Sequence, residues 1–77
     1  MTLRDQYILA QALVLGIEAL AAVKPPHREE SNLRDMIDLA ARPGIAPFTT
    51  AILASGQHSH ATALINGAVG PNPLNPL

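Results

Sequence analysis

The sequence contains no cysteine and no tryptophan, and tyrosine and phenylalanine occur once each among its 77 residues. Without cysteine, disulfides cannot hold the chain together, which excludes a disulfide-stapled scaffold. With two aromatic rings in all, the chain offers no platform on which nucleic-acid bases could stack. Its 5 basic side chains do not outnumber its 6 acidic ones, so we expect no nucleic acid among its partners.

Charged side chains are missing from almost half of the chain. All of them lie between Arg4 and Arg42, and residues 43–77 contain no Asp, Glu, Lys or Arg. The sequence therefore divides after Arg42 into a charged part and an uncharged part. Since the cores of protein interfaces are depleted in charge, an uncharged stretch of this length indicates a surface that lies against protein.

Long apolar runs are missing as well. Near the N-terminus, the apolar stretch without charge at residues 6–17 is shorter than the about 20 residues that a membrane-spanning helix requires. A signal peptide is disfavoured because Arg4 and Asp5 leave the first residues without net side-chain charge, and because Glu18 precedes the small-residue pattern at 19–21. We therefore expect no membrane span and a cytoplasmic location.

The charged part, residues 1–42, predicts a helical hairpin. Residues 3–23 carry apolar side chains at helical spacing on one side, and a second apolar set lies on another side. The second set is Ile8, Ala12, Leu15, Ala19 and Ala22, and the narrow polar strip is Arg4, Gln11 and Glu18. A helix that is apolar around most of its circumference needs neighbours on more than one side.

Prolines and a cap separate the two arms of this hairpin. Lys24-Pro25-Pro26 ends the first helix, because proline disfavours a helical conformation at the residue before it. We expect Ser31 or Asn32 to cap the second helix, with Asn32-x-x-Asp35 as a start that resembles a capping box. Pro43-Gly44 ends the second helix.

The uncharged segment at residues 43–69 is expected to pack on the hairpin or on a partner. Pro47 suits the first position of a helix, and Gly56 interrupts the segment, so we predict one or two short helices. Residues 70–77 contain Asn-Pro-Leu twice and predict an extended, proline-rich tail. The expected fold class is therefore all-α, a small hairpin followed by short helices and a tail.

Candidate residues for catalysis or metal binding are few. Ser55 and His58 could pair as nucleophile and base, but every carboxylate side chain that could orient the base lies in the charged part. His58 and His60 are weak metal candidates, because two histidines at this spacing share a side only in an extended or turned segment. We expect no enzyme and no cofactor, and a His-dependent metal-binding protein remains an alternative.

The composition favours a non-enzymatic protein–protein interaction module, a small adaptor or inhibitor that forms a homodimer and binds a larger protein. A chain this short has a small core and commonly gains stability by association. The residues expected to anchor the hairpin or dimer core are Leu13, Ile17 and Leu20. The residues expected to face a partner are Phe48, Ile52, Leu53, Leu64 and Ile65, with tail docking through Leu74 and Leu77. The alternative is a structural subunit of a large assembly, such as a virion or a multi-protein complex.

Overall fold

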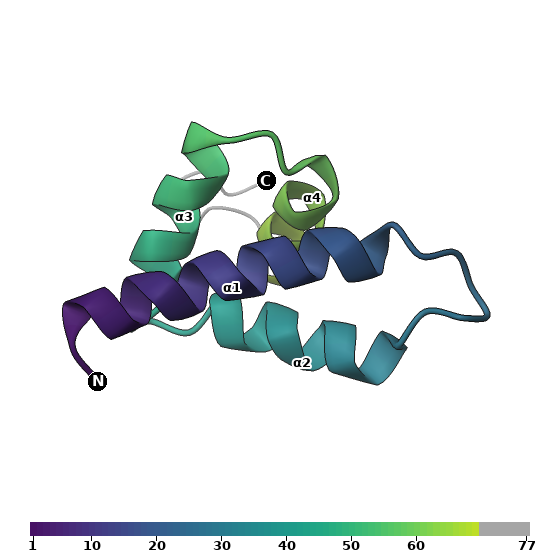
Figure 1. The fold of residues 1–77 in the computed structure, drawn as a ribbon, viewed down its shortest axis with the longest axis horizontal. Helices are drawn as coiled ribbons and strands as arrows, with labels where there is room; N and C mark the ends of the chain where they lie inside the picture. The colour runs from purple at the N-terminus through teal and green to yellow at the C-terminus, as the bar shows by residue number, and fades with distance from the viewer. Residues whose placement is uncertain (70–77) are drawn as a thin grey trace, which may run out of the picture.

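The computed structural model describes residues 1–69, so the predicted tail, with Leu74 and Leu77, lies outside the described residues. The described chain forms four α-helices: α1 (Leu3–Ala21), α2 (Glu30–Ala40), α3 (Ala46–Ser55) and α4 (Ser59–Val69). No strand occurs within residues 1–69, and the predicted all-α fold is confirmed. In Figure 1, α1 crosses the molecule, α2 runs back beside it, and α3 and α4 pack on its other flank.

α1 begins with a capping box formed by Thr2 and Asp5, which is not among the caps predicted above. The Thr2 hydroxyl oxygen accepts the backbone N–H of Asp5 at 3.1 Å, and the Asp5 carboxylate accepts the backbone N–H of Thr2 at 3.2 Å. These bonds satisfy two N–H groups that a helix start otherwise leaves unpaired. The helix ends at Ala21, slightly before the predicted boundary.

α2 begins earlier than the sequence predicts. Its N-cap is Glu29, which makes no capping bond through its side chain, so the predicted cap at Ser31 or Asn32 is wrong. The first turn closes because the Leu33 N–H donates to the Glu29 carbonyl at 2.9 Å. Glu30 places negative charge at the positive end of the helix dipole.

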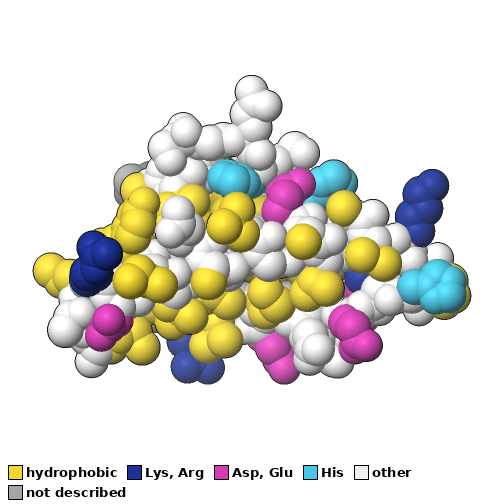
Figure 2. Space-filling model, in the orientation of Figure 1, with side chains coloured by type: hydrophobic (Ala, Val, Ile, Leu, Met, Phe, Trp, Pro, Cys, Tyr) yellow, Lys and Arg dark blue, Asp and Glu magenta, His cyan; other side chains and the backbone are white. Residues whose placement is uncertain are grey.

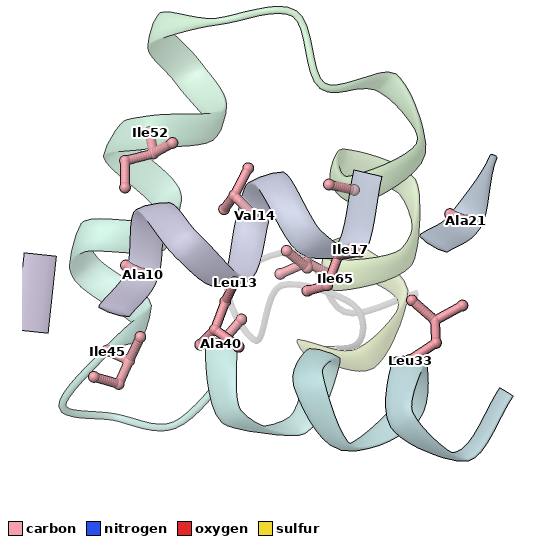
Figure 3. Close-up of a cluster of buried hydrophobic side chains, with 11 residues drawn as sticks. Ala10, Leu13, Val14, Ile17, Ala21, Leu33, Ala40, Ile45, Ile52 and Ile65 are labelled. Carbon is pink, nitrogen blue, oxygen red and sulfur yellow. The ribbon is translucent and has the colours of Figure 1, made fainter. Parts of the chain in front are cut away.

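The hydrophobic core lies between the four helices, and α1 contributes the largest share of it (Figure 3). Val14 and Ile17 are fully buried at its centre. The complete set of buried apolar residues is Ala10, Leu13, Val14, Ile17, Ala21, Leu33, Ala40, Ile45, Ile52, Ala61 and Ile65. Each helix therefore gives one apolar stripe to a shared core.

A buried threonine joins α2 to α3. Thr49 is 1% exposed, and its hydroxyl oxygen lies 3.0 Å from the Ala40 carbonyl oxygen and 3.2 Å from that of Ile45. Ala40 is the last residue of α2, and carbonyls at a helix C-terminus have no partner within their own helix. Thr49 has a weak preference for helices, but its hydroxyl group supplies the hydrogen-bond donor that the Ala40 carbonyl lacks within α2.

Gly56 separates α3 from α4, at the interruption that the sequence predicts. The space beside this glycine is occupied by His58, because a Cβ atom built on Gly56 would lie 2.6 Å from the His58 Nε2 atom. At the other end of α3, Pro47 stands in the first turn, as expected for a residue without a backbone N–H.

Candidate interaction surface

The second apolar set of α1 is left uncovered by the rest of the described chain. Ile8 and Leu15 are 48% and 54% exposed, and Ala12, Ala19 and Ala22 are exposed as well. Figure 2 shows hydrophobic side chains gathered along the visible side of α1. We call these five residues the outer face of α1.

The outer face repeats with a seven-residue period. Its members follow one another in alternating steps of four and three residues, the spacing of a coiled-coil seam. Ile8, Leu15 and Ala22 occupy one position of the repeat, and Ala12 and Ala19 occupy the other. Small residues at the second position would let a neighbouring helix approach closely, at the short end of the usual axis separation of about 8–10 Å.

Polar residues border the outer face on one side only. Arg4, Gln11 and Glu18 recur every seven residues along this border, and Arg4 and Gln11 are exposed. Along the opposite border, Leu9 and Gly16 are half-buried, and a Cβ atom on Gly16 would collide with the Met36 methyl group of α2. The polar border is therefore open at Arg4 and Gln11, whereas α2 covers part of the opposite border.

Glu18 links this border to α4. Its Oε1 atom accepts the Ala61 N–H at 2.9 Å, and its Oε2 atom lies 2.8 Å from His60 Nδ1. Ala61 stands in the first turn of α4, where N–H groups lack a partner within the helix. The Ala61 N–H, and next the His60 ring, hold the pKa of Glu18 below its usual value.

The candidate residues for a metal site and for catalysis, Ser55, His58 and His60, do not come together as a site in the structure. His60 contacts Glu18, a carboxylate that lies 42 residues away in sequence. No group of three metal-ligating side chains gathers around His58, His60 or elsewhere within residues 1–69. The Ser55 hydroxyl donates to the Ile52 carbonyl at 3.0 Å, so it is directed to its own helix rather than to His58.

The residues predicted to anchor the hairpin or dimer core lie at the core of this chain's own helices. Leu13 and Ile17 are 6% and 0% exposed, and Leu20 is half-buried against the same cluster. Leu13 and Ile17 lie on the side of α1 that faces the other three helices (Figure 3). The surface of α1 that remains open to a partner consists of other residues.

The residues predicted to face a partner are only partly accessible. Ile52 and Ile65 belong to the core, and Phe48 and Leu53 pack against it. The Phe48 ring meets the Tyr7 ring edge-on, with centroids 6.2 Å apart. Leu64 is the most open of the predicted set, at 37% exposed. Within residues 45–65, most of the large apolar side chains therefore pack inside this chain.

A cavity of about 300 Å³ opens between α3 and α4. Its walls carry no charged side chain and combine apolar with small polar groups: Ala40, Ala46, Thr49, Thr50, Leu53, Ala54, Thr62, Ile65 and Asn66. This cavity and the outer face of α1 share no residue, so the described chain has two separate surfaces with apolar character.

Comparison of the chain with protein-family models, with curated proteins and with solved structures found no match. Within residues 1–69, none of the helices combines the length and the apolar character needed to cross a membrane.

Proposed function

We propose that this chain is a non-enzymatic protein–protein interaction module that self-associates through the outer face of α1 and also binds a larger protein. The observation that carries the proposal is the exposure of Ile8 and Leu15, 48% and 54%, within a continuous apolar seam. Single exposed apolar residues are ordinary, but a contiguous patch on a small protein is typical of a binding surface.

The size of this surface suits a modest affinity. α1 has 19 residues and is therefore about 28 Å long. Packing against a helix of the same length would bury about 300 Å² per copy, below the about 800 Å² per partner of a standard interface. At about 25 cal/mol per Å², the about 600 Å² that the two copies bury together contributes at most about 15 kcal/mol before the costs of association are subtracted. We expect association that depends on concentration in the micromolar range.

Light scattering across a concentration series tests this proposal. The wild-type chain should gain mass with concentration, and the double variant Ile8→Gln/Leu15→Gln should remain a monomer with an unchanged helical circular dichroism spectrum. Leu64→Gln is the matched control, since it also removes an exposed apolar side chain but lies on α4. A wild-type chain that stays monomeric at high micromolar concentration, or a double variant that associates normally, would count against the proposal.

A structural subunit of a larger assembly is the second candidate. The observation that favours it is the uncharged cavity between α3 and α4, which adds a second apolar surface to the outer face of α1. A subunit with two separate interfaces can contact several neighbours, whereas a dimer closes on one. Sedimentation distinguishes the two, because an assembly subunit would form species much larger than a dimer.

A further inference from the structure

We infer that the outer face of α1 is occupied by a second copy of this chain, packed antiparallel around a two-fold axis beside Gln11 and Ala12. This inference rests on the proposed function, since it names the partner that covers the same face. Two observations carry it: the positions of the large residues along the seam, and the order of charges along its polar border.

The large residues of the seam are placed symmetrically. Ile8 and Leu15 lie at equal distances from the point between Gln11 and Ala12, about 5 Å along the axis on either side. Reversing a second helix around that point brings Ile8 of each copy beside Leu15 of the other. Ala12 of both copies then lies at the crossing point, where a small side chain permits close approach. The part of the face between Ile8 and Leu15 is thus complementary to itself, as a two-fold interface requires.

The polar border has nearly the same centre, which lies at Gln11, half a residue from that of Ile8 and Leu15. Arg4 and Glu18 lie seven residues before and after Gln11, about 10 Å away on either side. When two identical helices pack antiparallel, the same border of each faces the other. Arg4 would therefore meet Glu18 of the second copy, this pair would form twice, and the two Gln11 side chains would meet at the axis. Charges that flank a helical seam determine the orientation of the pair.

A parallel pair would lose this complementarity. In that orientation the polar border faces the opposite border of the second helix, which consists of Leu9 and Gly16. Arg4 and Glu18 would then have apolar neighbours that α2 partly covers. The order of charges thus favours the antiparallel arrangement.

Both charged groups can make the expected contact. Arg4 is exposed, and the ion pairs of residues 1–69 are Arg28 with Glu30 and His60 with Glu18, so Arg4 has no carboxylate partner within this part of the chain. The Glu18 side chain is 27% exposed. Its two oxygens each take one contact from α4, and a carboxylate offers about four acceptor positions.

Cysteine pairing tests the orientation, because the natural chain has no cysteine of its own. Ile8→Cys and Leu15→Cys are prepared as separate proteins, checked for helical content by circular dichroism, and oxidised alone and as a mixture. We expect the mixture to give at least about tenfold more disulfide-linked dimer than either protein alone, with the bond between positions 8 and 15. The geometry demands this, since a disulfide needs Cα atoms within about 7 Å.

The other outcomes separate this inference from the proposed function. If each variant alone cross-links as well as the mixture does, the helices are parallel and the inference is overturned. If no combination cross-links although the wild-type chain sediments as a dimer, another surface mediates association and the inference is again overturned. If the wild-type chain does not associate at all, both the proposed self-association and this inference are overturned.

Charge reversal at Arg4 tests the pairing of Arg4 with Glu18 of the second copy independently. Arg4→Glu converts two attractive contacts into two repulsive ones in the antiparallel dimer, and we expect the dissociation constant measured by sedimentation equilibrium to rise about tenfold at low salt. Arg4→Gln removes the attraction without adding repulsion, so it should raise the dissociation constant less than Arg4→Glu does. An unchanged dissociation constant for Arg4→Glu would overturn the inferred charge pairing.

Discussion

α1 has two apolar faces, and the chain covers only one of them. The inner face carries Val14 and Ile17, both 0% exposed, under α2, α3 and α4. The outer face carries Ile8 and Leu15, both about half exposed. Both faces consist of aliphatic side chains at helical spacing, so apolar character alone does not decide which face a single chain buries. The two faces differ in size of side chain: the inner face carries three large aliphatic residues, Leu13, Val14 and Ile17, and the outer face carries two.

This difference shows how a small chain can divide its apolar residues between folding and binding. The inner face supplies the core that makes residues 1–69 a folded unit. The outer face has a regular seam and a charged border, features that a face buried within one chain does not require. Four changes test whether the two faces have these separate roles, and they are ordered from the largest expected effect to the smallest.

A charge placed on each face should give opposite results. Ile17→Asp buries an unpaired carboxylate in the core, and we expect a loss of about 3–5 kcal/mol, comparable to the whole stability of a domain this small. Leu15→Asp introduces the same group on the outer face, and the chain should remain folded but lose association. Urea unfolding followed by circular dichroism measures both. A stably folded Ile17→Asp variant would refute the assignment of the inner face.

The covering of the inner face depends on Thr49, which connects α3 to the end of α2. Thr49→Val keeps the shape but leaves the Ala40 carbonyl without that donor, and we expect a loss of about 1–3 kcal/mol of unfolding free energy. Thr50→Val is the matched control, because Thr50 is exposed on the same helix, and its effect should stay within about 0.5 kcal/mol. Equal effects of the two substitutions would show that the buried hydrogen bond contributes nothing specific.

A substitution in the open part of α4 should stabilise the fold and leave the outer face unaffected. Gly67 lies inside α4, and a Cβ atom there would have no neighbour within 4 Å among residues 1–69. Gly67→Ala should therefore raise the unfolding free energy by about 0.5–1 kcal/mol, the usual gain of alanine over glycine in a helix. Thermal unfolding measures the gain, and light scattering should show unchanged association. A lower melting temperature would mean that α4 ends before Gly67 in solution.

Acid should weaken the link between the border of the outer face and α4. The contacts of Glu18 with the Ala61 N–H and with His60 lower its pKa in the folded chain. These contacts therefore add their full share to the unfolding free energy above the ordinary pKa of a glutamate. That share is lost as the pH falls through the lower pKa that Glu18 has in the folded chain. Urea unfolding between pH 3 and about pH 6 should show this loss in the wild-type chain and a flatter profile in Glu18→Gln. Identical profiles would show that the carboxylate does not stabilise α4.

Much of the fold follows from the sequence. The periodicity of residues 3–23 and the break at Gly56 predict α1 and the two short helices, because both are local signals. Thr2-x-x-Asp5 is equally local, and attention to that spacing would have found the cap of α1. The start of α2 was misplaced because the Asn32-x-x-Asp35 pattern competes with an earlier closure at Glu29.

The surface is less predictable from the sequence than the helices. Periodicity indicates that α1 has two apolar sets but does not reveal which set the later helices cover, since that choice depends on packing between distant segments. For the same reason Leu13, Ile17, Ile52 and Ile65 appear in the core of the chain. The contact of Glu18 with Ala61 joins residues 43 positions apart, and no local pattern encodes it.

The most direct test of the binding role of the outer face is a dilution series followed by two-dimensional ¹⁵N NMR of the wild-type chain. We predict that the amide signals that shift with concentration cluster around Ile8, Ala12 and Leu15, whereas those of Val14 and Ile17 change less. Signals that shift around the cavity between α3 and α4, with the outer face unchanged, would contradict this role. Signals that do not shift anywhere would exclude self-association.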